Sequence, residues 1–342
     1  MSNSCEEVLS ICQRHIGSWR GLTVADFDFA GPKGFSSFTM ALRCRRDGVD
    51  PEGVFFRRLA GKENAILDFE AERGVFLALG DADIAARCLH YSRGYRLETL
   101  YDGRSLTRED LRDPANLRGI AAELHRFHRL SPGGLPRDTF FERLHERWGR
   151  LARRVLEGDP GAFPEHERGL CGPLRSIFSD ETHRLVQRCL PDGPPVFSHN
   201  DTYHGNVMKL ASGEIKLLDF EFSCLGQRAF DFANLFAETT MRHGLAEPPH
   251  FALAEPDFGE AEIDTLIGYY LAHEPDLGVA ERKREHARLV RETRNLIPLS
   301  DYMYALAAIP LAVEPIQKIR FIPYASQRFA RFRRACEERF DG

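Results

Sequence analysis

The spacing of apolar residues changes near residue 100, and no other feature of the sequence constrains the fold as strongly. Before this point, short apolar or alternating runs are separated by Gly, Pro and Asp, a pattern typical of β-strands. These runs cover residues 27–29, 38–44, 54–59, 87–91 and 94–97. Only residues 65–79 have apolar side chains at helical spacing, and the segment 81–83 then ends the pattern. The first third is therefore predicted to be an antiparallel sheet with one helix.

After Tyr101 the apolar residues recur at helical spacing. Helices are predicted over residues 118–130, 140–156, 174–190, 229–241, 263–273, 282–296, 300–311 and 324–340. The exception is a group of short strands at 196–198, 207–210 and 215–218. Residues 1–20 are predicted to form a short amphipathic helix, and the stretches 131–136, 158–172 and 246–259 to form surface loops. Together these elements predict an α+β fold with two lobes, residues 1–100 and 101–342, around a cleft.

The composition excludes several classes of protein. Of the 342 residues, 43% are apolar and 28% are charged, as in ordinary soluble globular proteins. The net charge of -5 gives no footprint for a polyanion, so nucleic acid is not an expected partner. No apolar run has the length of a membrane span, and residues 1–20 do not resemble a signal peptide. The eight cysteines are scattered without a CxxC pair, which predicts reduced thiols in a cytoplasmic protein.

Polar residues with a common chemistry follow the short strands. Asp201 and Asn206 lie in the loop after the strand 196–198, and Asp219 comes directly after the strand 215–218. Phosphoryl transfer needs a carboxylate that orients the attacking hydroxyl, together with oxygen ligands for Mg²⁺ on the phosphates. We therefore expect Asp201 to be the base, and Asn206 and Asp219 to be catalytic residues that hold the metal. The alternative is that Asp201 only caps a turn.

The chain resembles the choline/ethanolamine kinase family, within the larger group that includes aminoglycoside phosphotransferases. The family's HNDxxxGN, DFEYS and RxFDxxNxFxE patterns are matched at 199–206, 219–223 and 228–238, with Phe222 in place of Tyr. The resemblance implies a protein-kinase-like fold and an ATP- and Mg²⁺-dependent kinase. It also implies that Asp231 braces the catalytic loop. His199 is expected to hold this loop by hydrogen bonds, and His204 receives no role.

The same resemblance implies that the first lobe binds the nucleotide. Arg58 is expected to contact the phosphates and Glu72 to pair with it, the alternative for Glu72 being a solvated helix face. A loop over the phosphates would contribute Gly34, Ser36 and Ser37, and the connector after residue 98 would bind adenine at Thr99 and Tyr101.

The acceptor implied by the resemblance is choline, ethanolamine or a related amino alcohol, because carboxylates and aromatic faces hold an ammonium group. The expected residues are Asp201, Tyr203, Glu221, Glu238, Tyr304 and Tyr324. Where the family has two tryptophans this chain has Tyr304 and Ala307, so choline is no stronger a candidate than ethanolamine. Core packing is the alternative for Tyr302 and Tyr304.

Two other functions remain open on the sequence. One is a kinase for another small hydroxyl compound, such as an aminoglycoside or thiamine, and the other is a non-catalytic pseudokinase. Members of the family often form homodimers, but no patch in the sequence identifies an interface.

Overall fold

The computed structural model describes residues 2–31, 38–59, 68–256, 258–313 and 319–340. The first part of the chain forms an antiparallel sheet, as predicted. Its strands are β1 (Phe27–Ala30), β2 (Thr39–Cys44), β3 (Gly53–Arg58), β4 (Cys88–Tyr91) and β5 (Tyr95–Thr99). They are ordered β1-β2-β3-β5-β4, and every neighbouring pair is antiparallel.

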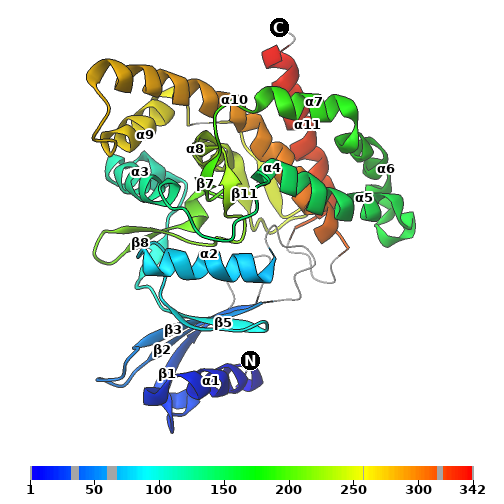
Figure 1. Ribbon diagram of the computed structural model, residues 1–342. Helices are drawn as coiled ribbons and strands as arrows, with labels where there is room; N and C mark the ends of the chain where they lie inside the picture. Colours follow the sequence, from blue (N-terminus) through cyan, green and yellow to red (C-terminus); the bar gives the residue numbers. More distant parts are fainter. Residues whose placement is uncertain (1, 32–37, 60–67, 257, 314–318, 341–342) are drawn as a thin grey trace.

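The helix α1 (Ser2–His15) covers one face of this sheet (Figure 1). Its buried residues Val8 and Cys12 pack in one apolar cluster with Leu42 and Phe56 of the strands and with Trp19. The amphipathic helix expected near the N-terminus is confirmed. Its apolar face packs against the sheet and forms one side of this apolar cluster.

The other side of the sheet faces α2 (Phe69–Asp81), which lies between the sheet and the helical part of the chain (Figure 1). The side chain of Asp68 caps the helix by accepting a hydrogen bond from the Ala71 amide at 2.9 Å. The helix ends at Asp81 as predicted, and the first residues of the predicted range, 65–67, lie outside the described residues. The buried residues of α2 pack with the helical part and not with α1.

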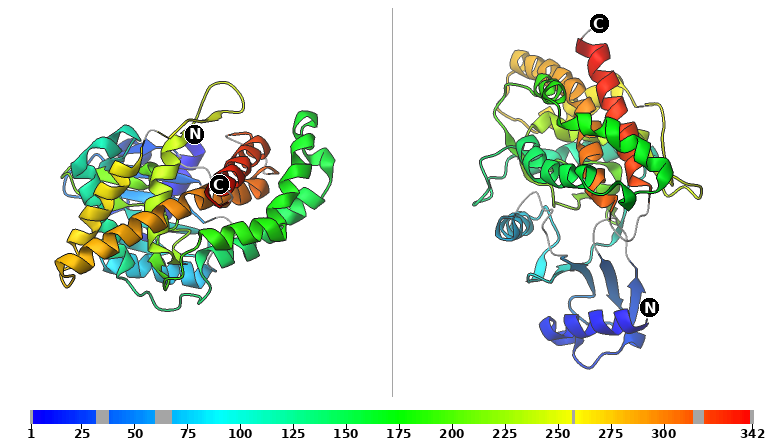
Figure 2. Two further views of the ribbon diagram at one scale, coloured as in Figure 1. Left: turned by 90° about the horizontal axis from the view of Figure 1, so that it is seen from above. Right: turned by 90° about the vertical axis from the view of Figure 1, so that its right-hand side faces the viewer.

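The remainder of the chain is mostly helical, as predicted. Its helices are α3 (Pro114–His128), α4 (Phe140–Arg143), a π-helical turn (Leu144–Trp148), α5 (Gly149–Glu157), α6 (Glu165–Leu174), α7 (Asp180–Cys189), α8 (Arg228–Ala237), α9 (Glu260–Ala272), α10 (Val279–Leu311) and α11 (Phe321–Phe340). Figure 2 shows α10 running along the whole of this part, beside α11.

Two predictions about this part were wrong. The ranges 282–296 and 300–311 form the single helix α10, which continues through Pro298. Proline costs one backbone hydrogen bond, but Leu296 and Leu299 on either side are fully buried, and their packing keeps the helix continuous. The predicted loops 158–172 and 246–259 contain α6 and the strand β12 (Phe251–Leu253), which pairs with β11 (Met241–His243).

The short strands of the second part of the chain form two small sheets, and one of them includes residues 103–105. β6 (Gly103–Ser105) pairs with β8 (Val207–Leu210), which pairs with β9 (Ile215–Leu217). β7 (Val196–Ser198) pairs with β10 (Cys224–Gly226). β6 and β10 were not predicted, and they are defined by their pairing with β8 and β7. The pairing brings the loop before β8 next to the segment after β9.

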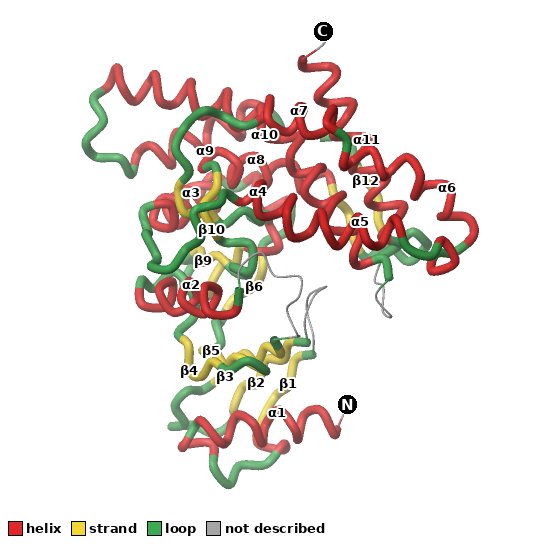
Figure 3. Tube along the Cα trace, turned by 45° about the vertical axis from the view of Figure 1, so that its right-hand side comes forward, coloured by secondary structure: helices red, strands yellow, loops and turns green. Residues whose placement is uncertain are grey.

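Figure 3 shows the five-stranded sheet with α1 on one side and α2 and the helical part of the chain on the other. The α+β fold class is confirmed, whereas a lobe boundary at residue 100 stays a prediction. None of the helices in the described part of the chain is both long enough and apolar enough to cross a membrane. All eight cysteines, each of them described, are free thiols.

Candidate active site

The loop from His199 to Asn206 is held by a buried carboxylate from α8. One oxygen of Asp231 accepts a hydrogen bond from the His199 amide at 2.8 Å, and the other accepts one from the Asn200 amide at 2.7 Å. The ring of His128 on α3 lies 2.9 Å from the same carboxylate. Burial acts to raise the pKa of Asp231, but the contacts with His128 and with the loop amide of His199 together lower it. An ionised Asp231 therefore braces the loop, as expected.

His199 ties the same loop to the segment before Asp219. Its Nε2 is 2.9 Å from the carbonyl oxygen of Leu218, and its Nδ1 accepts the Asp201 amide at 3.3 Å. The ring is fully buried, and burial lowers the pKa of His199. A neutral imidazole with both nitrogens in hydrogen bonds holds the loop, which is the role expected of it.

Asp201 and Asn206 are in direct contact. The side-chain amide of Asn206 donates to Asp201 Oδ2 at 2.9 Å and to the Asp201 carbonyl oxygen at 3.0 Å. The backbone carbonyl oxygen of Asn206 accepts a hydrogen bond from the Leu218 amide at 2.8 Å, which fixes the loop beside β9. Because the amide nitrogen is engaged with Asp201, the amide oxygen is the atom of Asn206 that could serve as a metal ligand.

Gly205 leaves room for an aromatic ring in this loop. A Cβ atom at position 205 would lie 2.5 Å from the ring of Tyr203, closer than any real contact. A larger residue at position 205 would therefore displace the ring of Tyr203 from its place over the loop.

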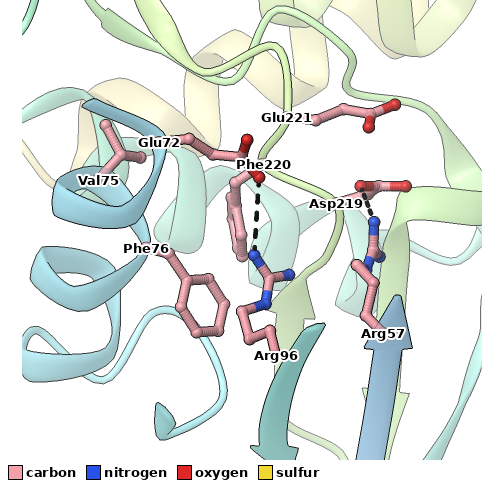
Figure 4. Close-up of a pocket in the computed structure, with 8 residues that line it drawn as sticks. All are labelled: Arg57, Glu72, Val75, Phe76, Arg96, Asp219, Phe220 and Glu221. Carbon is pink, nitrogen blue, oxygen red and sulfur yellow. Dashed lines mark hydrogen bonds and ion pairs between the residues drawn. The ribbon is translucent and has the colours of Figure 1, made fainter. Parts of the chain in front are cut away.

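Asp219 is paired with an arginine from the five-stranded sheet. Arg57 on β3 donates to Asp219 Oδ1 at 2.8 Å, and Figure 4 shows both in a pocket that Glu221 also lines. Burial acts to raise the pKa of Asp219, but the guanidinium groups of Arg57 and, to a lesser extent, Arg96 act against it, and the pKa is lowered. Asp219 is thus an ionised carboxylate with a positive partner.

Four carboxylates gather around the loop. Burial raises the pKa of Asp201 well above its usual range, and the charges of Asp219, Glu221 and Glu238 add to the rise. Asp201, Asn206 and Asp219 are therefore brought together, and the negative field at this point favours a cation. One carboxylate with one amide oxygen fits Mg²⁺, which keeps waters and phosphate oxygens as its other ligands. Among the described residues there is no group of three His, Cys, Asp or Glu that could hold a metal.

The structure replaces Arg58 by Arg57 as the arginine that faces this site. Side chains alternate along a strand, and Val54 and Phe56 point into the apolar cluster under α1. Arg58 has the same parity, so it points the same way and pairs with Glu7 of α1 at 2.9 Å. Arg57, on the opposite face, reaches Asp219.

Glu72 pairs with an arginine that the sequence did not suggest. The carboxylate lies 3.9 Å from Arg96 of β5 and not beside Arg58. Arg96 also donates to Glu98 at 2.6 Å and lies over the ring of Phe76, with 3.7 Å between the guanidinium carbon and the ring centre. Glu72 is only 6% exposed, so the alternative that it lies on a solvated helix face is wrong. In the structure Arg96 lies opposite Arg57 in the neighbouring strands β5 and β3.

The expected nucleotide contacts are only partly described. The Thr99 amide donates to the carbonyl of Arg87 at 3.0 Å, so it is engaged in the sheet. The Tyr101 hydroxyl is buried and has no hydrogen-bond partner among the described residues. Gly34, Ser36 and Ser37 lie outside those residues. The roles of these five positions stay predictions.

A fully buried arginine organises the expected acceptor residues. Arg328 on α11 contacts Glu238 at 2.5 Å and Asp301 at 2.7 Å. Its guanidinium carbon lies 4.9 Å from the ring centre of Tyr304 and 5.2 Å from that of Tyr324. Sequence reasoning missed Arg328, although its place one helical turn after Tyr324 was a signal. Glu238 is therefore compensated within the protein, whereas Glu221 lines the pocket beside Asp219.

Tyr302 belongs to the core, whereas Tyr304 packs against the core and also directs its hydroxyl to Asp201. Tyr302 is 2% exposed, and its hydroxyl lies 3.1 Å from Nδ1 of His145. Tyr304 is half-buried, and its hydroxyl donates to Asp201 Oδ1 at 2.5 Å.

An antiparallel sheet with one helix, joined to a helical part that carries two carboxylates and an amide on adjacent loops, is the arrangement of kinase-like phosphotransferases. The family model for choline/ethanolamine kinase matches residues 38–333, and the chain belongs to this family of ATP-dependent phosphotransferases with alcohol acceptors.

Relatives with known names are similar over most of the chain. A choline/ethanolamine kinase of Rattus norvegicus is 24% identical over 93% of this chain and 83% of its own length. A probable choline kinase of Arabidopsis thaliana is 28% identical over 69% of this chain and 65% of its own length.

The solved structures show the same fold. A choline kinase from Cryptosporidium parvum superposes with a TM-score of 0.77 at 19% identity, covering 98% of this chain and 96% of that one. An ADP-bound aminoglycoside phosphotransferase superposes with a TM-score of 0.56 at 12% identity, covering 95% of this chain and 97% of that one.

Proposed function

We propose that this protein transfers the γ-phosphoryl group of ATP to the hydroxyl of a small amino alcohol, choline or ethanolamine, in the presence of Mg²⁺. The observation that carries the proposal is the contact of Asp201 with Asn206 next to the Arg57–Asp219 pair. A base, an amide and a carboxylate thus lie at one point, with an arginine beside them.

Each of these residues has a defined part in the reaction. Asp201 accepts the proton of the acceptor hydroxyl as its oxygen attacks the γ-phosphorus, and the bond to the bridging oxygen of ADP breaks. Arg57 contacts the phosphates from β3. Asn206 and Asp219 would hold Mg²⁺, which neutralises charge on the phosphates when it is bound.

An ammonium group on the acceptor suits the charge of the site. The charges of Asp219, Glu221 and Glu238 act on Asp201, and Tyr203 adds an aromatic ring close enough to feel the charge of Asp201. Cations are attracted both to such a field and to aromatic faces. A homodimer and a cytoplasmic location remain predictions from the sequence.

A panel of acceptors tests the proposal. Purified protein with ATP and Mg²⁺ is offered choline, ethanolamine, an aminoglycoside and thiamine, and ADP release is measured. We expect turnover with an amino alcohol, and a loss of kcat of about 10²–10⁴-fold in Asp201→Asn with nucleotide binding retained. Turnover with the aminoglycoside or thiamine alone would contradict the acceptor, and Mg²⁺-dependent ATP binding without turnover on any compound would indicate a pseudokinase.

A further inference from the structure

The side chain of Tyr304 reaches the proposed base from a distant part of the chain. Its hydroxyl lies 2.5 Å from Asp201 Oδ1, and the two residues are 103 positions apart. Asn206 donates to the other oxygen, Oδ2, at 2.9 Å. Both carboxylate oxygens therefore have a donor, one from the loop itself and one from α10.

The tyrosine is itself fixed in place from two sides. The side-chain amide of Asn234 on α8 lies 3.4 Å from the Tyr304 hydroxyl oxygen, which can accept from it. The buried guanidinium of Arg328 lies over the face of the ring. A phenol oxygen that accepts from Asn234 directs its own hydrogen toward Asp201, so the donor has a defined direction.

Asn206 alone would not define the orientation of the base. A carboxylate held at one oxygen can still turn about the bond to its Cβ, whereas donors from two different elements restrict that rotation. A second donor also matters because a buried carboxylate loses water, and the nearby charges of Asp219, Glu221 and Glu238 add to the cost.

We propose that Tyr304 is a positioning residue of the phosphoryl transfer, whose hydroxyl holds the Asp201 carboxylate in the orientation that receives the acceptor hydroxyl. The inference rests on the proposed function, since it assigns Asp201 as the base. Tyr304 thus acts through Asp201, and an aromatic ring without the hydroxyl cannot replace it.

The chain offers a matched pair of variants for a test. Tyr304→Phe and Tyr302→Phe each remove one partly or fully buried hydroxyl from the same helix, but only the first contacts Asp201. We expect Tyr304→Phe to lower kcat about ten- to a hundredfold with the KM for ATP unchanged, because one hydrogen bond to a charged group is lost. Tyr302→Phe should keep the kcat and KM of the wild type within about twofold.

A double-mutant cycle separates positioning from folding. If Tyr304 acts through Asp201, then Tyr304→Phe causes little further loss in the Asp201→Asn background, whereas an independent structural defect adds to it. Melting temperatures of all variants are measured alongside. Equal kcat values for Tyr304→Phe and Tyr302→Phe, or fully additive losses in the cycle, would overturn the proposal.

The test is independent of the identity of the acceptor. If the wild type does not phosphorylate an amino alcohol, the proposed function fails, and the same comparison is made with the acceptor that is turned over or with slow ATP hydrolysis to water. A drop confined to Tyr304→Phe in that assay still supports the positioning role, and its absence overturns it.

Discussion

Arg57 and Arg58 are neighbours at the end of β3 and have opposite surroundings. Arg57 is mostly buried and contacts Asp219, with Glu98 and Glu221 near enough to help raise its pKa against the effect of burial. Arg58 is half exposed and pairs with Glu7 on the far side of the sheet. The face of the strand on which an arginine lies therefore decides whether it points toward Asp219 or toward α1.

These two arginines give a prediction at the residue scale. Arg57→Ala is expected to raise the KM for ATP about ten- to a hundredfold, because a charge-assisted contact contributes about 1.5–3 kcal/mol. Arg58→Ala should change it less than about threefold, since an exposed ion pair contributes about 0–1 kcal/mol. Steady-state kinetics at varied ATP measure both. A larger effect for Arg58→Ala would restore it as the phosphate contact.

At the scale of elements, α8 organises the catalytic loop. Asp231, near the start of α8, accepts hydrogen bonds from two amides of the loop, and His128 of α3 contacts the same carboxylate. His199 then joins the loop to the end of β9 through Leu218. Three elements thus converge on one carboxylate, so the loop geometry depends on α8 more than on the short strands around it.

Removal of this carboxylate is predicted to destabilise the protein strongly. Asp231→Ala leaves two buried amides without acceptors and is expected to lower the free energy of unfolding by about 3–5 kcal/mol. Asp180→Ala, which removes an exposed acid from the first turn of α7, should cost about 0.3–1 kcal/mol. Urea denaturation of both variants measures the difference. Similar losses for the two would show that the brace is not important for stability.

At the scale of the whole molecule, the buried apolar residues form two cores. The smaller one joins α1 to the five-stranded sheet, and the larger one joins α2 to the helices. The pair of Arg57 and Asp219 connects the sheet to the helical part at the active site. The site therefore lies where the two cores meet, which suits a nucleotide held by both.

The contact of α1 with the sheet gives a pH-dependent prediction. His15 and His90 stack with 3.6 Å between ring centres, and His15 is 2.8 Å from the Tyr95 hydroxyl. Burial lowers the pKa of both rings. The charge of Arg14 lowers the pKa of His15 further, and His15 does the same to His90. The unfolded chain, with a histidine pKa of about 6.5, then binds more protons than the folded one, so stability falls as the pH drops below about 6.5.

A single variant tests this effect. His90→Phe keeps an aromatic ring against His15 but removes one titrating group, so the fall in stability between pH 7.5 and pH 5.5 should become smaller. Urea denaturation at the two pH values measures it for the variant and the wild type. An unchanged or steeper fall in the variant would contradict the role of the stacked pair.

Several features of the fold could be predicted from local pattern alone. The strands of the first sheet, the position of α2 and most helices follow from apolar spacing with period 2 or 3.6, which is written into neighbouring residues. Asp201, Asn206 and Asp219 could be found because each lies in a loop next to a short strand: Asp201 after β7, Asn206 directly before β8 and Asp219 after β9. Pattern failed for β6, β10 and β12, which are short and defined by their partners.

The sequence by itself determined the fold class and the family, and it supplied the candidate residues for the chemistry, because these depend on spacing along the chain. The tertiary structure decided that Arg57 and not Arg58 meets Asp219, that Glu72 pairs with Arg96, and that α10 runs through Pro298. It also decided that Tyr304 reaches Asp201. Such contacts join residues far apart in sequence, and they depend on how whole elements pack, which no local pattern records.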